Sequence, residues 1–169
     1  MNVHNVSVGI TGHQQIADNA AWPWVTQEIE RVLKQHPRAA GVSSLAKGAD
    51  QVFAEVVIRC EMSLIVIIPC RGYEATFDKM GLAKYKRMLN LAYKSQTLDY
   101  DEPSEDAFFA AGREIVKRSS LMIAVWDGKP AKGLGGTGDV VNYAISQGKD
   151  VIHINPSTRQ VVIIGGAKT

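Results

Sequence analysis

Cysteine is scarce in this sequence, and long apolar runs are absent. Cys60 and Cys70 are the only two cysteines among 169 residues, too few for a disulfide framework, which indicates a reducing compartment. The N-terminal segment MNVHNVSVGI has neither the basic stretch nor the long apolar stretch of a secretion signal. The longest apolar runs have about six residues, whereas roughly 20 are needed to cross a bilayer. We therefore expect a cytoplasmic protein that does not associate with a membrane.

Several familiar site patterns are also missing. The four histidines and two cysteines have no metal-ligand spacing, so no metal is expected. The sequence contains no Gly-x-Ser-x-Gly elbow and no Walker A loop. No Gly-x-Gly-x-x-Gly loop follows the first expected strand, which argues against a standard NAD site. Nineteen basic and seventeen acidic residues give a net charge of +2, too small to indicate nucleic-acid binding.

What the sequence does contain is typical of a globular domain. Hydrophobic residues make up 46% of the chain and charged residues 21%, both ordinary values. Apolar runs that suit strands alternate with apolar residues at helical spacing along the chain. Strands are expected at 3–10, 41–46, 64–68, 121–126, 151–154 and 161–164, the last as a possible edge hairpin, with a short strand or a loop at 97–101. Helices are expected at 19–36, 49–60, 77–94, from Ser104 as N-cap to about 115, and at 140–148.

Strands separated by helices pair in parallel through right-handed crossovers. The alternation therefore predicts a doubly wound α/β fold, a mostly parallel sheet with helices on both faces. With no internal repeat and no linker, we expect residues 1–169 to form a single domain. In such a sheet, ligands bind beyond the carboxyl ends of the strands, so the segments that follow the strands are the place to look for a site.

The segment 133–139 carries the strongest signal. It has four glycines in six positions, 133 to 138, and a helix begins directly after it. Backbone N–H groups at a helix N-terminus favour phosphate, and the hydroxyl of Thr137 can add a donor. The alternative is a plain connection in which the glycines only relieve strain. We favour phosphate binding at Gly133, Gly135, Gly136 and Thr137.

Small, polar or charged residues follow the other strands too, and each has a structural alternative. Ser44, Lys47 and Gly48 precede the second helix, where Lys47 can neutralise an anion or simply face solvent. Arg71 can grip a phosphate with two hydrogen bonds or form a salt bridge with Glu74 or Asp78. The remaining candidates are Gly12 and His13, which can face a ligand or solvent, Tyr73, which can stack on a base or pack in the core, Asp127, which can bind ribose or form a turn, and Asp139, which can act on a ligand or pair with the helix dipole.

These segments together resemble the SLOG superfamily. The matching stretches are VGITGH (8–13), SSLAKGADQVFAE (43–55), VIIPCRGYEATF (66–77), LDYDEPSEDAFFAAGREIVKRSSLMIAVWDG (98–128) and GLGGTGDVVNYA (133–144). That superfamily includes the Lonely Guy phosphoribohydrolases, the Smf or DNA-processing protein A proteins and small stand-alone members, which this chain resembles most. The resemblance implies a three-layer, Rossmann-like domain that binds nucleotides or nucleotide-derived ligands, often as a homo-oligomer.

The match to the superfamily's Pro-Gly-Gly-x-Gly-Thr-x-x-Glu loop is partial. Gly136 and Thr137 match its Gly-Thr, Leu134 stands at its second glycine and Val140 stands at its glutamate, with Asp139 one position early. Gln14 stands where related proteins often have arginine after Gly-His. The SSLAKGAD segment resembles the Gly-x-Ala-x-Gly-Ile-Asp turn of the DNA-processing branch.

Three functions follow as hypotheses, in this order. The first is a small nucleotide-binding protein, a sensor or ligand-binding module without a required cofactor. The second is a phosphoribohydrolase that cleaves the N-glycosidic bond of a nucleoside 5′-monophosphate, with Asp139 in place of the missing glutamate and Arg71 on the phosphate. The third is a DNA-processing accessory role, which the scattered basic residues do not favour.

Overall fold

Seven strands form one sheet in the computed structural model, which describes residues 6–131 and 133–166. The order of the strands across the sheet is β4-β3-β2-β1-β5-β6-β7. Every neighbouring pair is parallel except β6 and β7, which confirms the mostly parallel α/β sheet. The strands are β1 (Ser7–Gly12), β2 (Ala40–Ser43), β3 (Leu64–Ile68), β4 (Lys94–Thr97), β5 (Leu121–Val125), β6 (Asp150–Asn155) and β7 (Gln160–Gly165).

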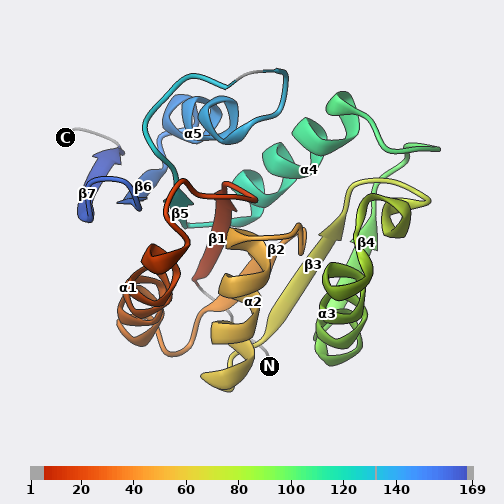
Figure 1. Cartoon of the computed structure of the whole chain (residues 1–169), viewed down its shortest axis with the longest axis horizontal. Helices are drawn as coiled ribbons and strands as arrows, with labels where there is room; N and C mark the ends of the chain where they lie inside the picture. The colour runs from red at the N-terminus through yellow and green to blue at the C-terminus, as the bar shows by residue number, and fades with distance from the viewer. Residues whose placement is uncertain (1–5, 132, 167–169) are drawn as a thin grey trace.

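Helices cover both faces of the sheet (Figure 1). One apolar cluster joins α1, α2 and α3 to the sheet through buried residues such as Ile29, Phe53 and Met88, and a second joins α4 and α5 to the other face through Ile115 and Val141. The three-layer arrangement is therefore confirmed. The helices are α1 (Trp22–Lys34), α2 (Ala49–Arg59), α3 (Lys79–Leu91), α4 (Glu105–Arg118) and α5 (Thr137–Ser146), with short 3-10 helices at Asn19–Ala21 and Tyr73–Thr76.

The expected elements all form, although the strand expected at 41–46 is β2 at Ala40–Ser43 and the helix expected at 140–148 is α5, which begins at Thr137. Ser104 caps α4 as expected, because its side chain accepts a hydrogen bond from the Ala107 N–H. The final hairpin also forms, with β7 antiparallel to β6 at the edge of the sheet. The expected start of the first strand at Val3 lies outside the described residues.

The other edge strand differs from its expected position. The helix expected at 77–94 ends at Leu91, and the strand or loop expected at 97–101 is strand β4 at Lys94–Thr97. All four residues of β4 are exposed. An edge strand with no buried side gives no alternation of apolar and polar residues, so the usual signal for a strand is missing.

Strand order reverses at β1, and this reversal positions the site. β1 pairs with β2 on one side and with β5 on the other, and crossovers run in opposite directions from it. The segments that follow β1 and β5 therefore leave the sheet toward opposite faces, since α1 packs on one face and α5 on the other. A crevice at the carboxyl ends of the strands results, which is the usual ligand position in open α/β sheets.

Candidate functional site

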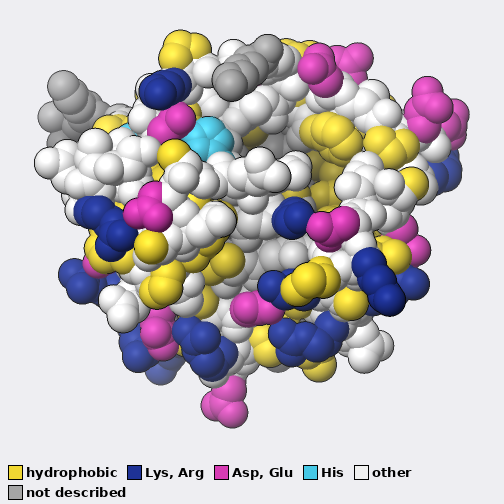
Figure 2. All heavy atoms as spheres, viewed as in Figure 1, with side chains coloured by type: hydrophobic (Ala, Val, Ile, Leu, Met, Phe, Trp, Pro, Cys, Tyr) yellow, Lys and Arg dark blue, Asp and Glu magenta, His cyan; other side chains and the backbone are white. Residues whose placement is uncertain are grey.

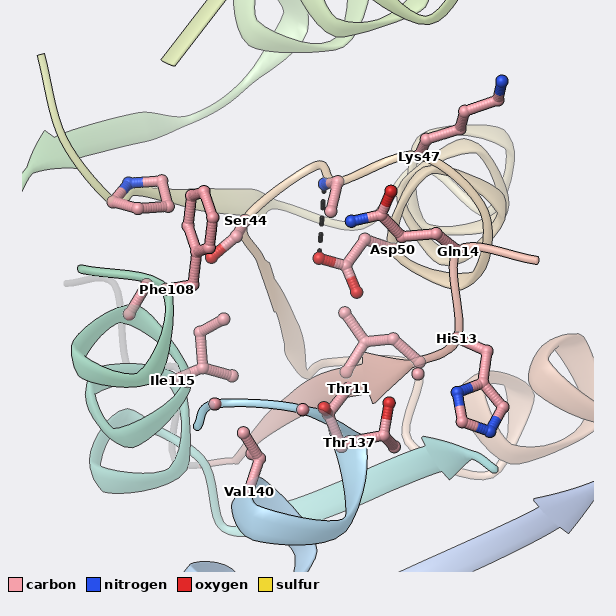
Figure 3. Close-up of a pocket in the computed structure, with 18 of the residues that line it drawn as sticks. Thr11, His13, Gln14, Ser44, Lys47, Asp50, Phe108, Ile115, Thr137 and Val140 are labelled. Carbon is pink, nitrogen blue, oxygen red and sulfur yellow. Dashed lines mark hydrogen bonds between the residues drawn. The ribbon is translucent and has the colours of Figure 1, made fainter. Parts of the chain in front are cut away.

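A cavity of about 840 Å³ lies at this reversal, beyond the carboxyl ends of the parallel strands. Residues that follow β1, β2, β3 and β5 line it, and α4 and α5 supply one wall (Figure 3). Nine of the residues expected at a ligand site lie along this cavity. They are Gly12, His13, Ser44, Lys47, Tyr73, Asp127, Gly135, Gly136 and Thr137.

Hydrogen bonds hold the turn between β2 and α2 in shape. The Ser43 hydroxyl donates to the Asp50 carbonyl and accepts from the Leu45 N–H, at 3.3 and 3.0 Å. The Asp50 carboxylate accepts from the Ala46 N–H at 3.3 Å. These bonds join the two ends of the turn, and Ser44 and Asp50 from this turn both line the cavity.

Close backbone contact fixes the start of α2 against the turn after β1. A Cβ on Gly12 would lie 2.5 Å from the Ala49 Cβ, and a Cβ on Gly48 would lie 2.4 Å from the Gln14 carbonyl oxygen. Gly48 also has a φ of +87°, a conformation that glycine adopts at little cost. The Ala49 N–H donates to the His13 carbonyl at 3.1 Å. The first two strand ends thus form one rigid side of the cavity.

Ser44 and Asp50 are buried polar side chains on that side that line the cavity. Ser44 is 7% exposed, and its hydroxyl oxygen is buried without a hydrogen-bond partner among the described residues. Asp50 is 8% exposed. Burial raises the pKa of Asp50 to about 7, and the hydrogen bond from Ala46 offsets only part of that rise.

On the opposite side, α5 begins at the cavity without a side-chain cap. Its N-cap is Gly136, which has no side chain to satisfy the first N–H groups of the helix. Thr137 is the first helical residue and lines the cavity with 9% of its surface exposed. The Gly135 N–H already donates to the Asp139 carboxylate at 3.0 Å. Anion-binding capacity at this end therefore rests on the start of α5 and on Thr137.

His13 and Asp127 lie next to each other where β1 and β5 end. His13 Nε2 is 3.2 Å from both the backbone nitrogen and the Oδ1 atom of Asp127. Burial favours the protonated form of Asp127, but the Lys129 N–H and His13 outweigh it and lower the pKa of that carboxyl. Asp127 is therefore an ionised acceptor that is partly engaged by the protein itself.

Aromatic side chains line the cavity on the β3 side. Tyr73 is 5% exposed, and its ring contacts Phe77, Tyr85 and Phe108 with centroid separations of 5.0, 5.6 and 6.3 Å. Tyr73 is thus part of the core as well as of the cavity wall. Phe108 is 38% exposed and presents a ring to the open space (Figure 3).

The remaining expected residues have other surroundings. Arg71 donates to Asp99 at 2.8 Å and lies 3.6 Å from Asp101, at the surface, so it forms a salt bridge with neither Glu74 nor Asp78. Lys47 lines the cavity, but its Nζ is 2.6 Å from Asp78 Oδ2. Gly48 lines a neighbouring cavity instead. Gly133 in the loop before α5 and Asp139 in the first turn of α5 do not line the cavity.

Asp50 and Thr11 line the cavity, although neither was among the expected site residues. A signal for Asp50 was available. It stands three residues before Phe53, which is completely buried, and helical spacing places such residues on the same face. A carboxylate on the inward face of a helix is unusual enough to mark a candidate site.

The described residues form neither a cluster of metal-ligating side chains nor a helix that could span a membrane. Within residues 6–131 and 133–166, no group of three or more His, Cys, Asp or Glu side chains could hold a metal ion. None of the helices in those ranges is long and apolar enough to cross a membrane.

Comparison with known proteins gives a structural likeness only. No family model matches the sequence, and no curated protein matches it. Among solved structures, DNA processing protein A of Streptococcus pneumoniae matches with a TM-score of 0.65 and 16% identity, over 88% of this chain and 50% of that one. The Helicobacter pylori protein of the same name, described for its single-stranded DNA binding mode, matches with a TM-score of 0.63 and 18% identity, over 88% and 64%.

A different kind of protein has a similar fold. The molybdenum cofactor binding protein of the phototrophic bacterium Rippkaea orientalis matches with a TM-score of 0.58 and 16% identity, over 89% of this chain and 76% of that one. The chain spans one half and about two thirds of the two DNA processing proteins. These matches agree with the resemblance seen in the sequence motifs. The chain therefore shares a Rossmann-like fold with DNA processing protein A and with the molybdenum cofactor binding protein.

Proposed function

We propose that this protein binds a small nucleotide or nucleotide derivative in the cavity, as a sensor or ligand-binding module. The observation that carries the proposal is the uncapped start of α5, which opens into a cavity of about 840 Å³ at the reversal of strand order. That volume lies within the roughly 300–1,000 Å³ of small-molecule sites. A phosphate at Gly136 and Thr137 would receive the N–H groups that the helix leaves unpaired.

The rest of the cavity suits the other parts of a nucleotide. Phe108 offers an exposed ring on which a base can stack, and Asp127 offers an ionised acceptor. One protein of similar fold is named for binding the molybdenum cofactor, so the fold accommodates large organic ligands in at least that case.

Neither of the other two functions has a specific observation in its favour. Asp139, the residue expected to act in a phosphoribohydrolase, lies in the first turn of α5 and accepts a hydrogen bond from the Gly135 N–H in the preceding loop, so its carboxylate has a structural role. Arg71 is engaged by Asp99 at the surface. For DNA binding, acidic and basic side chains are mixed over the face shown in Figure 2, without a basic stripe.

A thermal-shift panel tests the proposal. AMP, ADP-ribose, a dinucleotide and inorganic phosphate are each added to the wild type at increasing concentration. A bound ligand at a hundredfold excess over Kd stabilises the fold by about 2.7 kcal/mol. No stabilisation by any phosphorylated ligand contradicts the proposal.

A matched pair of variants locates the phosphate. Thr137→Val keeps the side-chain shape and removes the hydroxyl, and is expected to weaken phosphate binding by about 1–2 kcal/mol. Thr97→Val makes the same change on the exposed edge strand β4 and is expected to leave binding unchanged. Equal affinities for the two variants would place the phosphate elsewhere.

A further inference from the structure

Two polar side chains in the cavity lack the partners that their burial calls for. The Ser44 hydroxyl oxygen is buried with no hydrogen-bond partner among the described residues. The Asp50 carboxyl accepts one bond, from the Ala46 N–H, and no ion pair of the described residues includes it. Both line the same cavity. Buried polar groups in proteins are nearly always satisfied, so these two indicate where a ligand supplies hydrogen bonds.

The chemistry of the two groups limits what that ligand part can be. A carboxylate only accepts hydrogen bonds, and a serine hydroxyl both donates and accepts. A phosphate beside Asp50 would bring two negative charges together away from water. The anionic end of the ligand therefore belongs at α5, and the part beside Asp50 must be neutral and able to donate.

We infer that Asp50 and Ser44 form a second subsite, which takes the vicinal hydroxyls of a pentose while the start of α5 takes the phosphate. Figure 3 shows Asp50, from α2, pointing into the cavity across from Thr137 of α5. In a nucleotide the pentose is the part joined directly to the phosphate, so it is the part that reaches Asp50. The inference rests on the proposed function and deepens it, because it selects sugar phosphates with one anionic end over bisphosphates.

The surroundings of Asp50 give this subsite a dependence on pH. The titratable groups near it are Tyr73, whose pKa burial and Asp50 itself raise, Lys47, whose Nζ is held by Asp78, and across the cavity His13, which is next to Asp127. None of these groups forms an ion pair with the Asp50 carboxyl, so no cation among them offsets the effect of burial, which raises the pKa of Asp50 to about 7. Hydroxyl donors prefer the ionised carboxyl, so affinity is expected to rise about tenfold between pH 6 and pH 8, following the ionised fraction.

Titration calorimetry with three probes tests the subsite. The probes are ribose 5-phosphate, 2-deoxyribose 5-phosphate and inorganic phosphate, measured at pH 6, 7 and 8. The wild type is expected to bind ribose 5-phosphate about tenfold more tightly than the deoxy sugar at pH 8, as one hydrogen bond to a charged group allows.

Asp50→Asn keeps the side-chain shape and removes the charge. In this variant the preference for ribose is expected to fall below about threefold, the loss of a charge-assisted hydrogen bond, with inorganic phosphate binding retained. The ratio of wild-type to variant affinity for ribose 5-phosphate should rise about tenfold from pH 6 to pH 8, and this ratio cancels the titration of the sugar phosphate itself. Ser44→Ala should lower the preference while keeping the pH profile. Asp101→Asn, at a carboxylate whose side chain is 94% exposed, serves as the control and should behave as wild type.

The outcomes separate this inference from the proposed function. If no probe binds the wild type, the proposed function fails. If all three bind, but Asp50→Asn matches the wild type in preference and in pH profile, only the Asp50–Ser44 subsite is overturned. A wild type that binds both sugars equally at pH 8 also overturns it.

Discussion

The N-termini of α2 and α5 face the same cavity and look alike in sequence, yet they differ in what they offer a ligand. Each helix begins after a glycine with no side-chain cap, Gly48 or Gly136, and each has an aspartate in its first turn. Asp139 turns back and accepts from the Gly135 N–H. Asp50 instead lies buried in the cavity wall with one hydrogen bond. The same local pattern thus stabilises a loop at one helix and leaves a buried carboxyl in the cavity wall at the other.

The two N-cap glycines, Gly48 and Gly136, should differ most in how strongly a substitution by alanine destabilises the fold. At Gly48, φ is +87° and a Cβ would lie within 2.6 Å of backbone atoms of His13 and Gln14, so Gly48→Ala should destabilise the fold by about 3 kcal/mol or more. At Gly136, φ is −67° and the nearest contact is the Ala131 Cβ at 2.7 Å, so Gly136→Ala displaces the loop without backbone strain and should lose about 1–3 kcal/mol, less than Gly48→Ala. Urea denaturation of both variants measures the difference. Equal losses would show that the two helix starts are held alike.

Asp50→Asn should stabilise the protein at pH 8. The pKa of Asp50 rises from 3.8 to about 7 on folding, so the folded state binds the extra proton and wild-type stability falls as pH rises from about 4 to about 7. Removing the charge should recover on the order of 2–4 kcal/mol at pH 8 and almost nothing near pH 4. Urea unfolding at the two pH values checks this. A stability gain of the same size at both pH values would mean that burial does not raise the pKa of the Asp50 carboxyl.

Asp139→Asn should have the opposite sign and a smaller size. It weakens the bond from the Gly135 N–H, and the expected loss of stability is about 1 kcal/mol. Because Asp139 does not line the cavity, phosphate affinity measured by calorimetry should change less than about threefold. A large loss of phosphate affinity with stability intact would instead give Asp139 a direct role with the ligand.

Ser44→Ala should have the smallest effect on stability. Its hydroxyl oxygen is buried without a partner in the part of the chain that the structure describes, so its removal relieves a desolvation penalty and should leave stability unchanged or raise it by up to about 1 kcal/mol. Thermal melting of the ligand-free variant measures this. Clear destabilisation would show that the hydroxyl has a partner in the free protein.

The sequence predicted much of the fold because most of the strands are buried. The strands at Leu64–Ile68 and Leu121–Val125 are apolar throughout, and buried central strands require that composition. Strand β4, Lys94–Thr97, was placed too late in the chain because all of it is exposed. The position of the cavity was also predictable, since it follows from the strand order and needs no side-chain detail.

Individual site residues were harder to predict. Arg71 was expected on a ligand, but its guanidinium meets Asp99, which is 28 residues later in the chain. The spacing of Asp50 from Phe53 places it on the inward face of α2, but spacing alone does not show which groups surround its carboxyl. Its burial depends on Tyr73 and on the strand ends that pack around it, and no local pattern encodes those contacts.

The sequence by itself determined the order of strands and helices, the burial of the central strands and the glycine-rich start of α5, because apolar periodicity and backbone freedom are local properties. Only the tertiary structure decided which of two similar aspartates keeps a buried carboxyl in the cavity and which one braces a loop. Desolvation is the physical reason, since the pKa of Asp50 and the unpaired Ser44 hydroxyl both arise from chain segments that meet only when the sheet is assembled.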